Sequence, residues 1–264
     1  MYAKRVRLRV VAHSCSNQGS VRLADTYLFL PAVVTDGDRR DSKGMNAQVN
    51  APMDFYTFGS TNGHKVAIAL EELGFSYQVH TVNVFAGEGR TREFLAINPA
   101  GKIPVLRDNE ADLVLTESDA ILLYLADKAG RLVPSAGTER MRAVELLFLQ
   151  ASLQGPMFGQ RMHFSLFSAE AVPYGIRRYE EQGEHIDALV DLLLSGRSYF
   201  LGSEYSIVDV AFFSWYFASM AAGFAIGRHA NLDAWFKRVS ARPAVARGVA
   251  IPSPLPELPP RRVV

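Results

Sequence analysis

Hydrophobic residues follow two different periods in the first patterned part of the chain. Apolar residues recur at helical spacing between Val66 and Leu73, and Gly74 stops that helix. Short β-rich runs lie on either side of it, and a second helix follows, with Ser118 as its N-cap and Gly130 beyond its end. The predicted order is strand, helix, strand, strand, strand, helix, at residues 55–58, 64–73, 77–84, 103–106, 113–115 and 118–125. This order predicts an α/β domain over residues 53–131.

Strand signals cease after Pro134, and four long helical patterns follow, at residues 138–154, 172–194, 206–223 and 231–247. The uncharged run Val210–Gly227 begins within the third pattern and covers 18 positions, the lower length bound of a membrane-spanning helix. A capping box at Ser206 and Asp209 precedes it, and the serines within it are typical of a helix surrounded by other helices. We therefore predict an all-helical domain at residues 138–250, no membrane span, and a fold class of α/β plus all-α.

The two ends of the chain lack these patterns. Residues 1–50 carry eight Lys and Arg against four Asp, whereas the remainder carries 20 basic and 23 acidic residues. No apolar run of a signal peptide follows the first arginines. We expect residues 1–52 to be a basic, poorly ordered extension, and a translation start at Met45 or Met53 is a further hypothesis. Residues 251–264 form a Pro-rich tail.

Composition narrows the range of functions. The net charge of +1 argues against a nucleic-acid partner, which requires a concentrated basic surface. The histidines, at positions 13, 64, 80, 163, 185 and 229, show no ligand spacing, so we predict no metal site. The single Cys15 excludes a disulfide framework, a Cys-rich zinc site and a CxxC redox pair. We therefore expect that a bound ligand supplies the thiol for any thiol chemistry.

Two motifs are candidates for ligand binding. A cis Ile103–Pro104 bond at a strand entrance would leave the N–H and C=O of Ile103 free to pair with a peptide-like ligand, although a rigid corner explains the proline equally well. At the next helix start, the backbone N–H groups and the Ser118 hydroxyl suit a carboxylate, and Glu117 suits an ammonium group. Simple N-capping by Ser118 is the alternative.

A third motif, Gly59–Lys65, is the turn between the first strand and the first helix. The hydroxyls of Ser60 and Thr61, the amide of Asn62 and the helix N-terminal N–H groups converge there. Such a setting lowers the pKa of a thiol by stabilising its thiolate. A polar turn with a helix cap is the alternative interpretation.

The segments NPAGKIPVL, TESDAILLYLADK and SIVDVAFF, at these separations, resemble the glutathione transferase family from Asp54 to Val249. Three further segments, STNGHKVAIALEEL, GPMFGQRMHF and VPYGIRRYE, resemble the bacterial nu class, whose members are also described as glutathione-dependent disulfide-bond reductases. The resemblance implies a thioredoxin-like N-terminal domain, a helical-bundle C-terminal domain and a homodimer.

The resemblance also implies a role for each residue that would bind glutathione. The Ile103 backbone, before cis-Pro104, would pair with the cysteinyl part of glutathione. Glu117 and Ser118 would hold its γ-glutamyl end, and Lys102 would reach toward the glycyl carboxylate.

Asn62 falls on the asparagine that lies near the sulfur in the nu class. That class commonly shows Thr-Pro-Asn, whereas here Ser60 takes the threonine place and Thr61 replaces the proline. Which hydroxyl faces the sulfur is therefore open, and the register favours Ser60.

The helical domain is expected to form the substrate wall of the cleft. Tyr174 and Arg178 match a segment that faces the cleft, with a packed ring and a solvated charge as the alternatives. An apolar mouth that selects the second substrate is predicted from Met157, Phe158, His163, Phe164 and Phe167.

These features together predict a cytoplasmic, glutathione-dependent thiol–disulfide oxidoreductase. Bound glutathione would attack a small disulfide, and a second glutathione would resolve the product. Transfer of glutathione to an electrophile and peroxide reduction are expected side activities. The alternative is a non-catalytic binding or regulatory module with the same fold.

Overall fold

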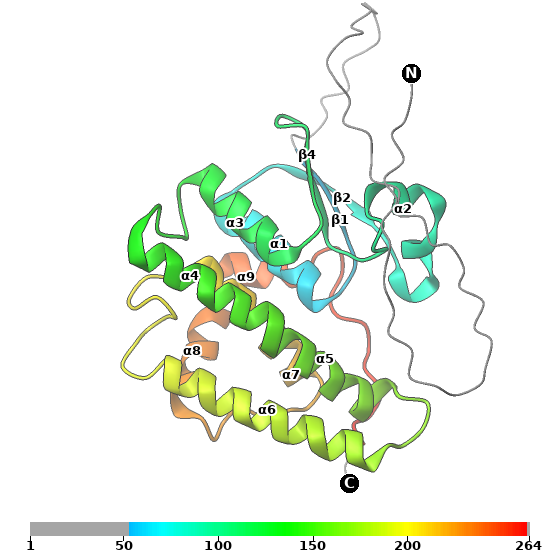
Figure 1. The fold of residues 1–264 in the computed structure, drawn as a ribbon, viewed down its shortest axis with the longest axis vertical. Coiled ribbons are helices and arrows are strands. Elements are labelled where there is room, and N and C mark those ends of the chain that lie inside the picture. Colours follow the sequence, from blue (N-terminus) through cyan, green and yellow to red (C-terminus); the bar gives the residue numbers. More distant parts are fainter. Residues whose placement is uncertain (1–52, 263–264) are drawn as a thin grey trace, which may run out of the picture. The chain divides into compact units, whose positions relative to one another are not determined.

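The computed structural model describes residues 53–262 (Figure 1). The predictions about residues 1–52, including Cys15, lie outside the described residues.

A four-stranded sheet forms the centre of the N-terminal part. The strand order is β2-β1-β3-β4, in which β1 is parallel to β2 and antiparallel to β3, and β3 is antiparallel to β4. The predicted strands are confirmed, but β2 ends at Thr81 rather than at residue 84, because the Asn83 side chain accepts hydrogen bonds from the next backbone N–H groups and starts a 3₁₀ turn. The strands are β1 (Met53–Thr57), β2 (Tyr77–Thr81), β3 (Val105–Asp108) and β4 (Leu113–Leu115).

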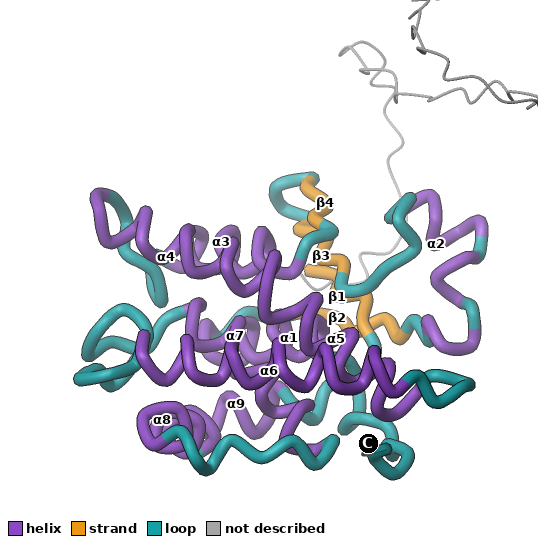
Figure 2. The backbone as a smooth tube through the Cα atoms, turned by 60° about the horizontal axis from the view of Figure 1, so that its bottom comes forward, coloured by secondary structure: helices purple, strands orange, loops and turns teal. Residues whose placement is uncertain are grey.

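Helices cover both faces of this sheet. Helices α1 (Thr61–Leu73) and α3 (Ser118–Ala129) lie on one side, and α2 (Arg92–Ile97) lies on the other (Figure 2). Helix α2 was not predicted from the sequence, and neither were the two 3₁₀ turns before it, η1 (Val84–Ala86) and η2 (Glu88–Arg90). Helix α2 has six residues and one buried side chain, which is too short a segment to show a helical period.

Alternation along the strands explains the two layers. Phe55 and Leu106 point into the main core with α1 and α3, whereas their neighbours Tyr56 and Val105 pack in a smaller cluster around Phe94 of α2. The sheet is therefore apolar on both faces, and the thioredoxin-like arrangement is confirmed.

The C-terminal part of the described chain is helical, as predicted. Its elements are α4 (Gly137–Leu149), the π-helical segment η3 (Gln150–Gln154), α5 (Gly155–Met162), the π-helical segment η4 (His163–Phe167), α6 (Pro173–Leu193), α7 (Ile207–Ala221), α8 (Ala230–Ser240) and α9 (Pro243–Gly248).

Two predicted helix boundaries were wrong. The helix predicted at 138–154 continues to residue 167 through the two π-helical segments. The helix predicted at 231–247 divides into α8 and α9, because a proline at 243 restricts the residue before it and Arg242 is extended, with φ −76° and ψ 129°.

The uncharged segment predicted as a core helix is α7. Its capping box is confirmed, since the Ser206 hydroxyl accepts from the Val208 N–H and the Asp209 carboxylate accepts from the Ser206 N–H. Most of α7 is buried, and the indole N–H of Trp235 donates to Asp209 at 2.8 Å. In the part of the chain that the structure describes, no helix has the length and apolarity needed to cross a membrane.

One hydrophobic core joins the N-terminal and helical parts. It contains Phe55 and Leu122 from the first part and Phe158, Phe213 and Trp235 from the second, all fully or almost fully buried. Helix α1 packs against both α7 and α9. The two parts are therefore held in a fixed relation around the first turn of α1.

Residues 251–262 of the Pro-rich tail lie against both parts and reach the segment before α6 (Figure 1). At its beginning it approaches Gly59 so closely that an added Cβ would lie 2.9 Å from the Pro254 carbonyl oxygen. Farther along, Leu258 packs against the cluster that contains Leu166 and Phe224. The Arg262 N–H donates to the carbonyl of Ser165 at 2.8 Å.

Candidate functional site

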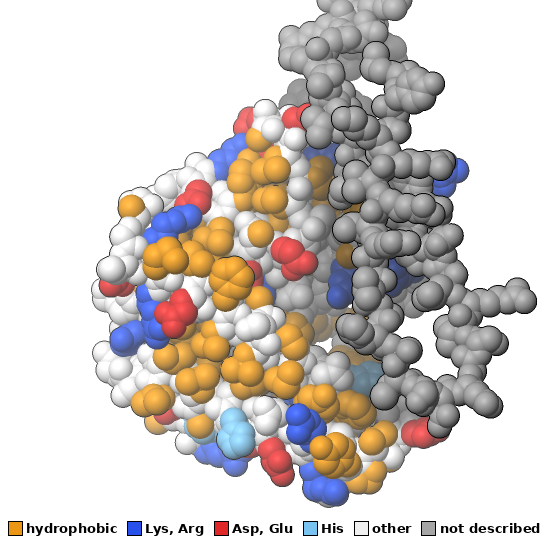
Figure 3. All heavy atoms as spheres, viewed as in Figure 1, with side chains coloured by type: hydrophobic (Ala, Val, Ile, Leu, Met, Phe, Trp, Pro, Cys, Tyr) orange, Lys and Arg blue, Asp and Glu red, His pale blue; other side chains and the backbone are white. Residues whose placement is uncertain are grey.

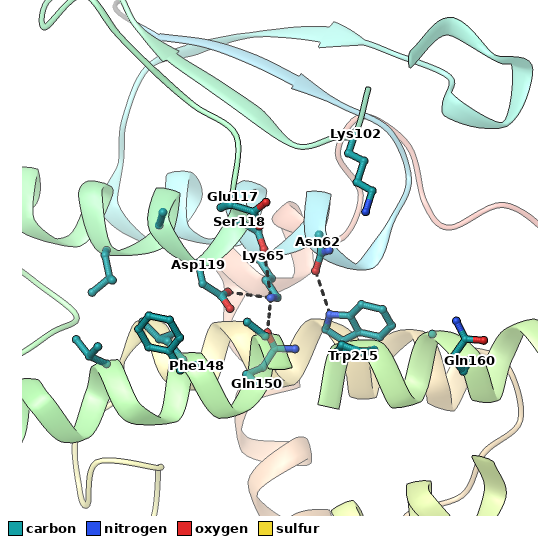
Figure 4. Close-up of a pocket in the computed structure, with 18 residues that line it drawn as sticks. Asn62, Lys65, Lys102, Glu117, Ser118, Asp119, Phe148, Gln150, Gln160 and Trp215 are labelled. Carbon is teal, nitrogen blue, oxygen red and sulfur yellow. Dashed lines mark hydrogen bonds and ion pairs between the residues drawn. The ribbon is translucent and has the colours of Figure 1, made fainter. Parts of the chain in front are cut away.

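A cavity of about 720 Å³ lies where the N-terminal part meets the helical part (Figure 4). Its walls come from the start of α1, the loop before β3, the start of α3, helices α4 and α5 with the segment between them, and α7. Four residues predicted from the sequence line it: Asn62, Lys102, Glu117 and Ser118. Its volume is in the range of small-molecule sites.

The Asn62 amide is oriented by a tryptophan of the helical part. The indole Nε1 of Trp215 on α7 donates to Asn62 Oδ1 at 3.0 Å (Figure 4). An indole N–H is only a donor, so it assigns the oxygen of the amide to Trp215. The Asn62 Nδ2 group is thereby left as a donor, and both side chains line the cavity.

The hydroxyls on either side of this turn are placed differently. The Ser60 Oγ accepts from the Gly63 N–H at 3.2 Å and is the N-cap of α1, and Thr61 is the first residue of that helix. Neither side chain is among the residues that line the cavity. The capping interpretation therefore accounts for the Ser60 oxygen, while its hydroxyl proton stays free to donate.

The loop before β3 has the predicted backbone. The Ile103–Pro104 bond is cis, and Asn98 fixes the loop by donating to the Lys102 carbonyl at 2.6 Å and accepting from the Ala100 N–H at 3.0 Å. Ile103 lies outside the β1–β3 register, and no backbone hydrogen bond of Ile103 is found among residues 53–262. Its N–H and C=O therefore have no backbone partner in the described chain, while Ile103 and Pro104 are not among the residues that line the cavity, and their role in ligand binding stays a prediction.

The start of α3 differs from the expected cap. Glu117 occupies the N-cap position and makes no side-chain capping bond, and Ser118 is the first helical residue. The prediction that Ser118 is the N-cap was therefore wrong by one residue. The Ser118 Oγ instead accepts from Lys65 Nζ at 3.3 Å, so its hydroxyl is not used up by capping.

A buried ammonium group that was not predicted from the sequence lies beside Ser118, and Lys65 and its partners Asp119 and Gln150 also line the cavity. Lys65 on α1 is 2% exposed, and its Nζ also donates to Asp119 Oδ1 at 2.8 Å and to Gln150 Oε1 at 2.5 Å (Figure 4). Burial lowers the pKa of Lys65, and the negative charges of Asp119 and Glu117 oppose that effect.

Three further predicted residues lie away from this cavity. His163, Tyr174 and Arg178 are exposed and do not line it.

The predicted apolar mouth is not the wall of this cavity. Phe158 belongs to the core and is fully buried, so its placement at the mouth was wrong. It points inward because α5 turns another face to the cavity, with Gly155 and Gly159. The rest of that wall includes Phe148 and Trp215.

A second charged cluster lies in the helical part. Glu184, Asp187 and His229 place potential metal-ligand atoms within 4.8 Å of one another, which the spacing of the histidines alone did not indicate. Arg161 lies 3.9 Å from Glu184 and 3.8 Å from Asp187, and Arg228 also pairs with Glu184. Guanidinium groups therefore already balance these carboxylates, and the cluster is an ion-pair network.

Comparison with known proteins is consistent with this geometry. Residues 51–127 match the family model "Glutathione S-transferase, N-terminal domain", and residues 177–238 match "Glutathione S-transferase, C-terminal domain". The disulfide-bond oxidoreductase YfcG of Escherichia coli (strain K12) is 33% identical over 202 residues, which cover 75% of this chain and 94% of that protein.

Solved structures of relatives have the same fold. A glutathione transferase family member from Pseudomonas fluorescens pf-5, with two glutathione molecules bound, gives a TM-score of 0.72 at 33% identity and covers 81% of this chain and 96% of that one. A glutathione transferase from Pseudomonas putida, with one glutathione disulfide bound per subunit, gives a TM-score of 0.72 at 31% identity, over 78% and 94% of the two chains. Fold, family models and relatives agree, and the chain belongs to the glutathione transferase family.

Proposed function

We propose that this protein is a glutathione-dependent thiol–disulfide oxidoreductase in which bound glutathione supplies the reactive thiol. The sequence from residue 53 to residue 262 contains no cysteine, so the described cavity has no thiol of its own. The Escherichia coli relative is named a disulfide-bond oxidoreductase, and the relatives from Pseudomonas bind glutathione or its disulfide.

Glutathione binding is assigned to the four predicted residues that line the cavity and to the loop before β3. The N-terminus of α3 and the Ser118 hydroxyl would bind the α-carboxylate of the γ-glutamyl group, and Glu117 would pair with its ammonium group. The Ile103 backbone would pair with the cysteinyl part, and Lys102 would attract the glycyl carboxylate.

Asn62 is proposed to stabilise the thiolate. Its Nδ2 donor, fixed by the bond from Trp215, would point toward the sulfur, and the N-terminus of α1 adds a positive partial charge. A hydrogen bond to a charged group contributes about 1.5–3 kcal/mol. That energy corresponds to a thiol pKa lower by about one to two units. Ser60 and Thr61 are secondary candidates, because neither side chain lines the cavity, and the family register favours Ser60 of the two.

The reaction balances without a protein thiol. The bound thiolate attacks one sulfur of a disulfide, the S–S bond breaks, and the departing thiolate takes a proton from water. The mixed disulfide that forms is attacked by the thiolate of a second glutathione, which releases the other thiol and glutathione disulfide. In total, two glutathione molecules are oxidised for each disulfide reduced. Conjugation to an electrophile and peroxide reduction would use the same activated thiolate.

The observation that carries this proposal is the convergence in one cavity of an amide donor oriented by Trp215 and a carboxylate site at Ser118. The test compares the parent with Asn62→Ala and with the control Asn83→Ala, which removes an asparagine that caps η1 instead. Turnover of the mixed disulfide of glutathione and 2-mercaptoethanol should fall about 10- to 100-fold in Asn62→Ala, the range of one charged hydrogen bond, and should be unchanged in Asn83→Ala.

The non-catalytic module is the competing function. Retention of the parent on immobilised glutathione without turnover of the mixed disulfide would favour it. Absence of both retention and turnover would reject glutathione as the ligand.

A homodimer and a cytoplasmic location remain predictions. Hydrophobic side chains gather over α3 and α4 on the face seen in Figure 3, and Met141 and Phe148 of α4 are 64% and 70% exposed. Sedimentation of the full chain, with and without Phe148→Ser, tests whether this face joins two copies.

A further inference from the structure

The three N–H bonds of the Lys65 ammonium group are all used inside the protein. An ammonium group has three donors, and Nζ finds three acceptors: Ser118 Oγ at 3.3 Å, Asp119 Oδ1 at 2.8 Å and Gln150 Oε1 at 2.5 Å. Lys65 is also 2% exposed. It therefore has no donor left for a ligand, and any effect on ligand binding must act through its three partners.

Lys65 and its three partners all line the cavity, and the Ser118 hydroxyl is the partner that has a proton to donate to a carboxylate. A hydroxyl has one proton and two lone pairs, and a lone pair of Ser118 Oγ faces Lys65 Nζ. The proton must then point away from Nζ. Asp119 Oδ1 and Gln150 Oε1 accept from the same ammonium group, and Asp119 Oδ2 has no hydrogen-bond partner in the described chain, so it does not accept the Ser118 proton. The proton is left to an acceptor in the cavity, which Ser118 lines.

Gln150 itself is held in place by the helical part. Its Nε2 donates to Gln154 Oε1 at 3.1 Å, and Gln154 Nε2 donates to the Phe212 carbonyl of α7 at 3.4 Å. Both glutamines are buried. This chain of amides fixes the Gln150 oxygen toward Lys65, so the ammonium position is set from α1 and from the helical part together.

We propose that Lys65 is a positioning residue for glutathione: it holds the Ser118 hydroxyl with its proton directed at the α-carboxylate of the γ-glutamyl group. The proposal rests on the proposed function, because it takes glutathione as the ligand. Asp119 balances the charge of Lys65 at 2.8 Å, so the ammonium group orients the donor rather than attracting the carboxylate from a distance.

A double-mutant cycle on the full chain tests this role. Lys65→Met and Ser118→Ala should each weaken glutathione binding about threefold to tenfold, the effect of one hydrogen bond. The double variant should bind no more weakly than Ser118→Ala alone, because Lys65 acts through that hydroxyl. The turnover number at saturating glutathione should stay at the parent value in Lys65→Met. The control Lys128→Met removes a lysine paired with Asp108 and Glu110 outside the cavity, and glutathione binding should be unchanged.

A glutathione analogue that lacks only the γ-glutamyl α-carboxylate provides a second readout. The affinity of Lys65→Met for this analogue should equal that of the parent protein, because the analogue has no carboxylate to accept the Ser118 proton. Equal weakening for the analogue and for glutathione would overturn the proposal, as would multiplying effects in the double variant or unchanged glutathione binding by a folded Lys65→Met.

Lys65→Met leaves the Asp119 carboxylate unpaired. If this variant does not fold, a second variant that also removes the carboxylate charge is used. Lys65→Met combined with Asp119→Asn removes both charges. In this version, Asp119→Asn is the reference protein, and Lys65→Met and Ser118→Ala are added to it singly and together. Glutathione binding that is no weaker with both changes than with Ser118→Ala alone supports the proposal, and multiplying effects overturn it. Failure of the parent to bind glutathione would instead reject the proposed function. Weakening by Ser118→Ala without weakening by Lys65→Met would reject only the role of Lys65.

Discussion

The bond from Trp215 to Asn62 predicts that a residue of the helical part controls the acidity of the bound thiol. Trp215→Phe keeps an aromatic ring at the cavity and deletes the N–H that donates to Asn62 Oδ1 at 3.0 Å. A neutral hydrogen bond contributes about 0.5–1.5 kcal/mol. If that energy keeps Nδ2 on the sulfur, its loss lowers kcat/KM for disulfide reduction about 2- to 13-fold. It also raises the pKa of bound glutathione by up to about one unit.

The assay is the ultraviolet absorbance of the thiolate of bound glutathione, titrated with pH, together with kcat/KM for the mixed disulfide. The pKa of the bound thiol distinguishes two effects of the substitution. Lost orientation of Asn62 raises this pKa, whereas a change in cavity shape alters only the KM. Trp235→Phe is the matched control, because it deletes an indole N–H bonded at 2.8 Å to Asp209, away from the cavity. The control should lower the free energy of unfolding and leave the thiol pKa unchanged. The same thiol pKa in Trp215→Phe as in the parent would refute this reasoning.

Three other predictions concern the surroundings of the cavity. Ser60→Ala should lower the free energy of unfolding by about 1 kcal/mol through loss of the α1 cap and should reduce turnover less than Asn62→Ala, as urea titration and kinetics would show; an equal loss of turnover would make Ser60 a second thiolate donor. His64 is fully buried, and burial lowers its pKa to about 4, so the neutral side chain stabilises the fold above pH 6.5 and this stabilisation is lost as the pH falls toward 4. Between pH 7 and pH 4.5 the free energy of unfolding of the parent should fall by about 2–3 kcal/mol more than that of His64→Leu. Equal decreases in the two proteins would contradict the effect of burial on His64. A chain that ends at Ile251 should unfold with about 2–4 kcal/mol less free energy than one that ends at Arg262, because it lacks the Leu258 packing and the Arg262 hydrogen bonds; identical urea midpoints would show that the tail adds no stability.

The sequence predicted the elements whose local signals are strong. Spacing alone identified the helix ends at Gly74 and Gly130 and the capping box at Ser206. Each of these signals depends on residues within one helical turn of each other. The strand entrance at Pro104 is equally local. Helix α2 and the π-helical continuation after Leu149 lack such signals and were missed.

The site was only half predictable for the same reason. Asn62, Ser118 and Lys102 stand in recognisable motifs, whereas the groups that orient them are distant in the chain. Lys65 lies 85 positions from Gln150, and Asn62 lies 153 positions from Trp215. Periodicity does not report such pairs. A lysine inside the apolar run of α1 was the one signal that could have indicated a buried, partnered ammonium group.

In the proposed reaction glutathione, and not the protein, provides the thiol. Turnover of the mixed disulfide by the full chain carrying Cys15→Ser tests it most directly, because Cys15 is the single cysteine in the sequence. We predict the parent rate, with one glutathione disulfide formed for each disulfide reduced. Loss of glutathione-dependent turnover in folded Cys15→Ser would contradict the account.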